Sequence, residues 1–257
     1  MRRYWPGMSS ALVALAFAPG LAIGSFLNVV AARVPLKRSL VRPGPACMAC
    51  SAPIAWYDNI PLVSYVVLRG KCRSCGERIS LVYPAVELVS GLLVVACVLE
   101  FGLTFEAAIA AFFCCVLVAI SAVDIAHRIV PDRIVLPATA IVLVAQTIRE
   151  PSPEWILAAF GGALFLFLAV LVYPAGMGMG DVKLALLMGA ALGKLVSVAI
   201  MVGMVAALVP SVYLLARHGR AARKMGIPFA PFLALGSIVA LFAGDVLLDG
   251  YLGLLAQ

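Results

Sequence analysis

The sequence predicts an all-α polytopic membrane protein with about eight transmembrane helices and one small cytoplasmic loop domain that resembles a zinc knuckle. Of its 257 residues, 64% are hydrophobic and only 12% are charged. A soluble domain is nearer half apolar and a quarter charged. The apolar residues also gather in long stretches, and a membrane-spanning helix needs about 20 such residues in a row.

Eight apolar stretches account for the predicted helices. They cover residues 4–32, 80–99, 105–123, 134–148, 155–173, 184–193, 195–216 and 229–250. We interpret 184–193 and 195–216 as two helices joined by a tight turn at Lys194. The alternative is one re-entrant segment followed by one span.

The segment between the first two helices differs in composition from the rest of the chain. Residues 33–79 are polar, basic and rich in Pro and Cys. The predicted division is therefore a first transmembrane helix at 1–32, a four-cysteine (zinc) loop domain at 33–79, and a seven-helix membrane core at 80–257.

The basic residues predict the orientation of the helices. With eight spans, 15 Lys and Arg residues fall on one side of the membrane and four on the other. The side that is rich in Lys and Arg faces the cytoplasm in most membrane proteins. A cleaved signal peptide ending at Ala16-Phe17-Ala18 is an alternative for the N-terminus. It is disfavoured because the apolar stretch continues to Arg33.

The net charge of +7 does not indicate a nucleic-acid partner. No basic surface interleaved with aromatic residues accompanies it, as nucleic-acid binding would require. The partner that the composition does predict is the lipid bilayer.

Two isolated aspartates, Asp124 and Asp181, stand at the ends of apolar stretches. Ionisable groups at membrane depth are costly, which makes them candidate functional residues. Two membrane crossings separate them, so both emerge on the cytoplasmic side and can face each other. Two carboxylates in one site can share a single proton, which suits general acid–base hydrolysis of a peptide bond.

The surroundings of Asp181 allow two interpretations. Gly176, Gly178 and Gly180 precede it, and because they lack Cβ atoms they let backbone or substrate approach closely. The alternative is that both aspartates are helix ends at the water interface, where Asp is a common N-cap.

Glu87, near the start of the helix at 80–99, is a third acidic residue at membrane depth. A buried glutamate must be paired or protonated. A functional role and a structural hydrogen bond are equally compatible with its position.

Seven cysteines divide into two groups. Cys47-x-x-Cys50 and Cys72-x-x-Cys75 have the spacing of a tetrahedral zinc site in a reducing compartment. Cys97, Cys114 and Cys115 lie in apolar helices and are interpreted as small hydrophobic residues. The segment from Trp56 to Pro61, between the two pairs, is expected to be a turn packed on the metal knuckle.

The chain as a whole resembles the type IV prepilin peptidases. The matching pieces are Gly24-Ser25-Phe26-Leu27-Asn28-Val29 with Arg33 and Pro35, the two Cys-x-x-Cys pairs, Trp56 to Pro61, Tyr83-Pro84-Ala85-Val86-Glu87, Asp124 with Pro131-Asp132, Gly178-Met179-Gly180-Asp181-Val182-Lys183, and Pro228-Phe229-Ala230-Pro231-Phe232. They cover nearly the whole chain in the family's order. His127-Arg128 after Asp124 departs from the more neutral residues that are common there. The Gly-x-Gly-Asp proteases of the presenilin type are a more distant resemblance.

The resemblance implies that Asp124 and Asp181 are catalytic and that Gly178, Gly180, Lys183 and Glu87 support them. It implies cleavage of a basic leader from prepilins or pseudopilins after a glycine, at the cytoplasmic face of a bacterial inner membrane. It further implies methylation of the new N-terminal amine by S-adenosyl-L-methionine. Because the cysteine loop is present, the bifunctional form is favoured over a peptidase without methyltransferase activity.

Two other functions remain as alternatives. Glu87, Asp124 and Asp181 could form the ion relay of a transporter, although the internal repeats that are common in transporters are not seen. Alternatively, the cysteine loop could recruit a partner while the helices serve only as an anchor.

Overall fold

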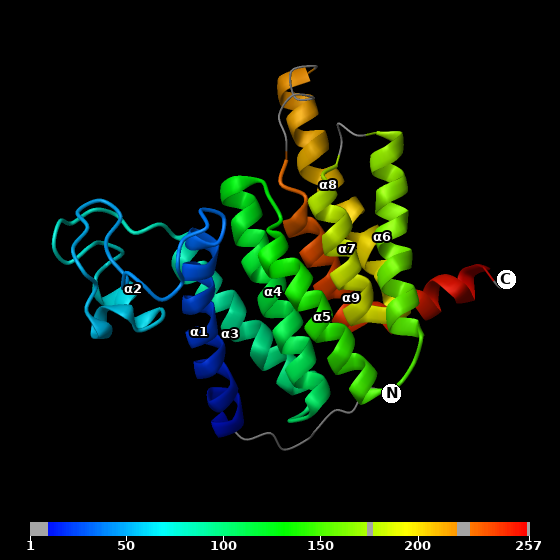
Figure 1. Ribbon diagram of the computed structural model, residues 1–257, viewed down its shortest axis with the longest axis horizontal. Coiled ribbons are helices and arrows are strands. Elements are labelled where there is room, and N and C mark those ends of the chain that lie inside the picture. Colours follow the sequence, from blue (N-terminus) through cyan, green and yellow to red (C-terminus); the bar gives the residue numbers. More distant parts are fainter. Residues whose placement is uncertain (1–9, 174–176, 220–226, 256–257) are drawn as a thin grey trace. The chain divides into compact units, whose positions relative to one another are not determined.

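The computed structural model describes residues 10–173, 177–219 and 227–255. Within these residues the chain is helical and forms no β-strand (Figure 1). The eight long helices are α1 (Ser10–Arg33), α3 (Val82–Phe101), α4 (Phe105–His127), α5 (Asp132–Arg149), α6 (Glu154–Val172), α7 (Met179–Leu192), α8 (Val196–His218) and α9 (Ala230–Leu255). The shorter ones are η1 (Trp56–Asn59), α2 (Val63–Val67) and η2 (Gly193–Leu195). The predicted all-α fold with eight long helices is confirmed.

Two helix boundaries differ from the prediction in a way that affects the aspartates. The helix expected to end at 123 continues to His127, so Asp124 lies inside the last turn of α4. The helix expected to begin at 184 begins at Met179, so Asp181 lies in the first turn of α7. Gly180 is therefore helical, and the acidic side chain of Asp181 in the first turn favours helix initiation there. Residues 4–9, Pro174, Gly176 and the basic residues Arg220, Arg223 and Lys224 lie outside the described residues.

Six stretches of the described chain are long and apolar enough to cross a membrane. One of them, Met179–Arg217, contains α7, η2 and most of α8. With 14 residues, α7 is about 21 Å long, which is shorter than a bilayer core of about 30 Å. Whether α7 and α8 are two spans or a re-entrant segment plus one span therefore stays a prediction, as does the predicted division into three domains.

The chain forms two compact units, Met1–Ala122 and Val123–Gln257, which divide within α4. In the first unit α1 packs against α3 through small residues. A Cβ at Gly20 would lie 2.8 Å from the Gly91 Cα, and one at Gly24 would lie 2.7 Å from the Glu87 Cα. Glycines at these positions let the two helix backbones approach closely, as in many membrane helix pairs. Cys97, Cys114 and Cys115 are buried in this unit.

In the second unit α7 is the central helix and contacts α5, α6, α8 and α9. Ten of its residues are buried, including every one from Leu187 to Leu192. A Cβ at Gly189 would collide with the backbone of Ala158 and Ala159 in α6, so only glycine allows this approach. α7 is therefore enclosed along most of its length.

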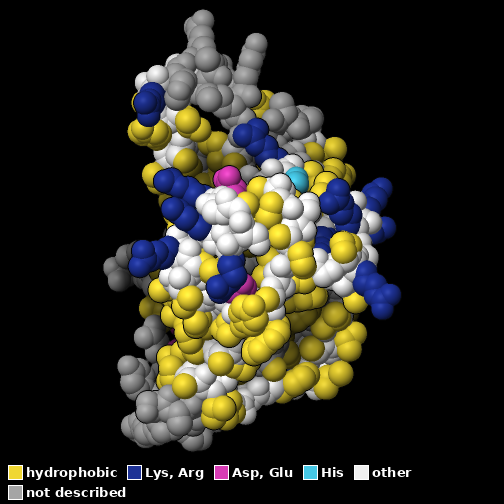
Figure 2. Space-filling view, turned by 90° about the vertical axis from the view of Figure 1, so that its left-hand side faces the viewer, with side chains coloured by type: hydrophobic (Ala, Val, Ile, Leu, Met, Phe, Trp, Pro, Cys, Tyr) yellow, Lys and Arg dark blue, Asp and Glu magenta, His cyan; other side chains and the backbone are white. Residues whose placement is uncertain are grey.

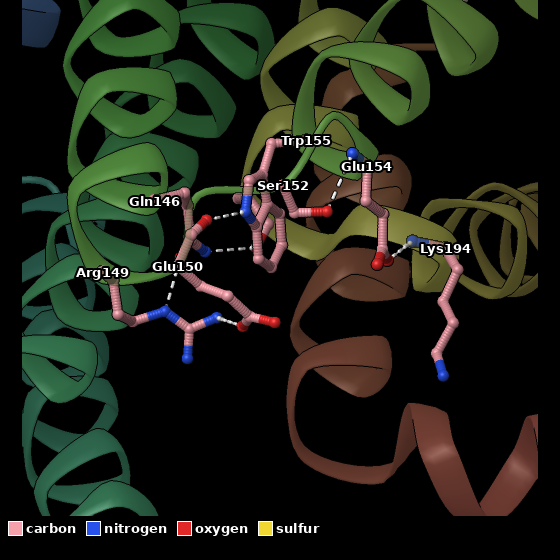
Figure 3. Close-up of polar contacts among 8 residues, drawn as sticks. Gln146, Arg149, Glu150, Ser152, Glu154, Trp155 and Lys194 are labelled. Carbon is pink, nitrogen blue, oxygen red and sulfur yellow. Dashed lines mark hydrogen bonds and ion pairs between the residues drawn. The ribbon is translucent and has the colours of Figure 1, made fainter.

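A cluster of polar contacts holds the C-terminal end of α7 (Figure 3). The Gln146 side chain in α5 donates to the carbonyl of Ala191 at 2.9 Å. The Glu154 carboxylate in α6 accepts a hydrogen bond from the backbone N–H of Lys194 at 2.9 Å. We call these two contacts the α7 clamp. Because α7 is a continuous helix, the clamp also restrains Asp181 at its other end.

Candidate active site and metal cluster

Asp124 is buried at the end of α4, with 6% of its surface exposed. Its Oδ2 accepts a hydrogen bond from the backbone N–H of Ala230 at 3.1 Å. Ala230 is the first residue of α9, and the first N–H groups of a helix have no partner inside the helix. Asp124 satisfies one of these donors from a helix 106 residues away in sequence.

Asp181 is held in a similar way at the start of α7. Its exposed fraction is 8%, and its Oδ2 accepts the backbone N–H of Gly178 at 3.1 Å. Each aspartate thus binds a backbone N–H at the start of a helix, and Asp181 takes part in the cap of α7, but both side chains are buried rather than solvated. Backbone donors orient both carboxylates and leave further oxygen lone pairs available to other partners.

Asp124 and Asp181 line one cavity of about 530 Å³. Its wall comes from the end of α4, the turn into α5, the start of α7 and the residues before α9. The lining residues are Asp124, Arg128, Ile129, Val130, Asp132, Met177, Gly178, Gly180, Asp181, Lys183, Ile227, Pro228 and Phe229. The structure therefore brings together the two aspartates, Gly178, Gly180 and Lys183, which the sequence predicted to share a site.

The two glycines have different surroundings. A Cβ at Gly180 would lie 2.9 Å from the Val130 Cβ, so Gly180 allows the α4–α5 turn to pack directly on α7. A Cβ at Gly178 would have no neighbour closer than 3.8 Å. Gly180 is needed for close packing, whereas Gly178 borders open space in the cavity.

Lys183 forms an ion pair with Asp132 across the cavity lining, with Nζ 2.6 Å from Oδ1. The two side chains are 35% and 55% exposed. Exposed pairs of this kind contribute only about 0–1 kcal/mol to stability. With Arg128 they add charged groups to a cavity whose two aspartates are buried.

Glu87 belongs to the first unit, on α3. Its Oε2 accepts a hydrogen bond from the backbone N–H of Leu62 at 2.9 Å. Leu62 has a positive φ of 59°, which is unusual for a residue with a side chain. Glu87 therefore anchors a strained turn of the cysteine segment to α3.

The four cysteines of the loop domain form a cluster that could hold a metal ion. All four Sγ atoms of Cys47, Cys50, Cys72 and Cys75 lie within 4.8 Å of one another. The Sγ atoms of Cys47 and Cys75 are 3.8 Å apart. Tetrahedral coordination with Zn–S bonds of about 2.3 Å requires sulfur separations of about 3.8 Å, so the geometry suits zinc.

The thiols of this cluster differ in their affinity for protons. Backbone hydrogen bonds from Cys50 and Ala49 lower the pKa of the Cys47 thiol to about 6. At Cys75 the backbone N–H of Glu77 lowers the pKa, but the neighbouring thiol of Cys50 opposes it, and the pKa rises to about 12. The thiolate form that binds metal is thus already favoured at Cys47.

An ion pair attaches η1 to the second cysteine pair. The Arg73 guanidinium donates two hydrogen bonds to the Asp58 carboxylate, at 2.7 and 2.6 Å, and this holds the pKa of Asp58 below its usual range. Tyr57 lies under the same guanidinium, but Trp56 is 81% exposed. The turn is attached to the knuckle as predicted, although Trp56 itself projects away from it.

Comparison with known proteins covers most of the chain. Residues 19–101 match the bacterial peptidase A24 N-terminal domain, and residues 111–215 match the type IV leader peptidase family. A Bacillus subtilis protein named prepilin leader peptidase/N-methyltransferase is 35% identical over 94% of this chain and 98% of its own length. The chain belongs to the type IV leader peptidase family.

Other members of the leader peptidase family carry the same name. The Xanthomonas campestris protein is 35% identical over 91% of this chain and 92% of its own length. The Pseudomonas aeruginosa protein is 33% identical over 91% of each chain. No solved structure matches this chain. The comparisons support an enzyme and give no support to the transporter alternative.

Sequence reasoning missed part of this leader peptidase site. Pro228, Phe229 and Ala230 were recognised only as part of a motif of the family, and the lining residue Ile227 was not recognised. A sequence signal was present in Pro228 and Pro231, because proline is common where a helix begins. The contact partner, Asp124, could not be deduced from that signal.

Proposed function

We propose that Asp124 and Asp181 are the catalytic pair of a membrane aspartic endopeptidase. The enzyme removes the leader peptide of type IV prepilins or pseudopilins and methylates the new N-terminal residue. The observation that carries the proposal is the shared cavity, in which the two buried carboxylates are each oriented by a backbone N–H. Family membership supplies the reaction and the class of substrate.

Paired carboxylates can hydrolyse a peptide bond without a metal ion. The ionised aspartate removes a proton from water as the water oxygen attacks the scissile carbonyl carbon. The protonated aspartate donates a hydrogen bond to the carbonyl oxygen, and the proton taken from water passes to the leaving amine. Gly178 supports this chemistry by leaving open space beside Asp181. Gly180 supports it by allowing the α4–α5 turn to pack closely on α7. Lys183 supports it by holding Asp132 at the cavity wall.

We further propose that the enzyme lies in the bacterial inner membrane with its basic loop in the cytoplasm. The excess of Lys and Arg on that side supports this orientation. It places residues 33–79 as a cytoplasmic loop domain between the first span at 1–32 and the membrane core at 80–257. Glu87 then supports the site indirectly, by attaching the loop domain to the membrane helices.

Zinc is the metal we propose for the cysteine cluster. Cys47, Cys50, Cys72 and Cys75 would hold it with four thiolates, and Lys and Arg residues nearby offset the negative charge. Its role is structural, because a loop of this size has little apolar core of its own.

The proposed methyl donor is S-adenosyl-L-methionine, which supplies an electrophilic methyl group to the new N-terminal amine. The names of the relatives support this activity. We assign no residue of this chain to binding the donor. The alternative is a peptidase without methyltransferase activity.

The test uses full-length protein in proteoliposomes with a prepilin and S-adenosylmethionine that carries a labelled methyl group. The wild-type protein is expected to release the leader and to label the cleaved pilin. The Asp181→Asn variant should do neither, since methylation follows cleavage, but it should methylate a pilin supplied already cleaved. The Asp245→Asn variant, in an exposed position on α9, is the matched control and should process normally. Cleavage by Asp181→Asn would refute the catalytic assignment, and an unlabelled product from wild type would favour the peptidase-only alternative.

A further inference from the structure

An exposed apolar surface lies on α2, the five-residue helix within the cysteine segment. Val63, Val66 and Val67 are 54%, 73% and 67% exposed. Contiguous apolar patches that are bordered by polar residues commonly mark contact with a partner or a membrane. We call the side chains of these three valines the α2 surface.

The hydrogen bond between Leu62 and Glu87 sets the depth of the α2 surface. Leu62 immediately precedes α2, and its N–H is 2.9 Å from the Glu87 carboxylate. Glu87 lies five residues into α3, about 7.5 Å along the helix axis from Val82. α3 has 20 residues, and a helix of about 30 Å only just spans a bilayer core. The hydrogen bond therefore holds the start of α2 no farther from the bilayer centre than the point at which α3 enters the bilayer.

The chain around α2 is tied to the membrane helices at the same level. Asn28, near the end of α1, donates to the carbonyl of Tyr83 at 3.0 Å and so joins the two spans beside the loop. Leu81 and Val82, where the chain enters α3, are 72% and 48% exposed. With α3 entering the bilayer at Val82, apolar side chains exposed at this level would meet lipid rather than bulk water.

Basic residues follow the α2 surface directly. Arg69 and Lys71 are exposed and lie two and four residues after the end of α2. On the face of the molecule in Figure 2, Lys and Arg side chains lie beside hydrophobic ones. Long basic side chains that flank a shallow apolar surface reach lipid phosphates while their stems stay in the apolar region.

We propose that α2 is an interfacial helix that rests in the lipid headgroup layer. Val63, Val66 and Val67 enter the boundary of the acyl chains, and Arg69 and Lys71 contact lipid phosphates. The partner is a phospholipid surface, and its consequence is that the cysteine cluster is held close to the membrane. The proposal rests on the geometry of the first unit and is independent of the catalytic assignment.

The test is the depth of a tryptophan placed on the α2 surface. Trp5 and Trp56 are changed to Phe, which leaves the buried Trp155 as a constant background. Val66→Trp is then compared with Met48→Trp, a control at an 84% exposed position of the cysteine loop. Both full-length proteins are placed in vesicles of phosphatidylcholine and phosphatidylglycerol and titrated with a brominated lipid or with aqueous iodide.

The proposal predicts that Val66→Trp loses most of its added fluorescence to the brominated lipid and is protected from iodide, while Met48→Trp shows the reverse. Equal access of iodide to both positions would overturn it. Protection of Val66→Trp from both quenchers would mean that protein covers the α2 surface, which also overturns it. Protection from iodide that appears only after a prepilin is added would assign the surface to substrate instead. Val67→Trp repeats the measurement if Val66→Trp does not accumulate.

Discussion

Gly180 is the residue whose size is most tightly limited at the candidate active site. A Cβ there would lie 2.9 Å from the Val130 Cβ. The Cβ of Val130 cannot move aside unless its backbone moves, because valine is branched at that atom. We predict that Gly180→Ala pushes the α4–α5 turn away from α7 and separates Asp124 from Asp181. A misplacement of about 1 Å can cost roughly 100-fold in rate, so cleavage of a prepilin should fall by about 10- to 100-fold.

Gly178→Ala is the matched control for the stability of this variant, because its added Cβ would have no neighbour closer than 3.8 Å. It should leave the thermal midpoint of the protein in detergent unchanged. Overpacking at Gly180 is expected to cost about 1–3 kcal/mol, offset in part by the better helix propensity of alanine, about 1 kcal/mol. Wild-type cleavage by Gly180→Ala would show that this close contact does not position the aspartates.

At the level of single residues, the sequence predicted that Asp124 and Asp181 share a site, because that prediction depended only on the number of helices between them. It could not predict the contact between Asp124 and Ala230, which are 106 residues apart and meet only through the packing of α9. It also misplaced the start of α7. Glycine disfavours a helix on average, but at Gly180 the tertiary contact with Val130 outweighs that propensity.

Among the elements, α7 is restrained at both ends. Asp181 accepts the Gly178 N–H at its start, and the α7 clamp formed by Gln146 and Glu154 holds its end. We predict that Gln146→Leu destabilises the protein by about 1–3 kcal/mol, because the buried carbonyl of Ala191 loses its donor. Thr147→Ala, one residue along α5 on an exposed position, should change stability by less than about 0.5 kcal/mol.

Thermal unfolding of both variants in the same detergent measures this difference. Equal thermal midpoints for Gln146→Leu and Thr147→Ala would show that the hydrogen bond from Gln146 contributes nothing to the stability of the protein. The sequence offered no signal for the clamp, since Gln146 was simply one polar residue in an apolar helix.

The cysteine segment behaves as an element of its own, and we predict that it binds one zinc ion per chain. Cys47→Ser should lower the zinc content of the purified protein because a serine hydroxyl does not replace a thiolate ligand. Cys97→Ser, at a buried cysteine of α3, is the control and should retain the metal. Elemental analysis of the purified variants measures the zinc. A zinc content in Cys47→Ser equal to that of wild type would contradict the site.

For the whole molecule, the family match and the packing divide the chain at different places. The two matching regions are separated by residues 102–110, which comprise the turn between α3 and α4 and the first six residues of α4. The two compact units instead divide within α4, just before Asp124. The last turn of α4, which carries the proposed catalytic residue Asp124, thus belongs to the second unit, and the turns before it belong to the first. Composition and spacing predicted the helices well, but a packing boundary inside a continuous helix leaves no mark in the sequence.

The central claim is that Asp124 and Asp181 act together on one peptide bond. The most direct measurement is the rate of prepilin cleavage by Asp124→Asn, Asp181→Asn and the double variant, each in proteoliposomes at equal protein content. Residues that act as one unit have strongly non-additive effects. We predict that each single variant loses as much activity as the double variant. Cleavage that persists in either single variant, or two partial losses that multiply in the double variant, would contradict a shared site.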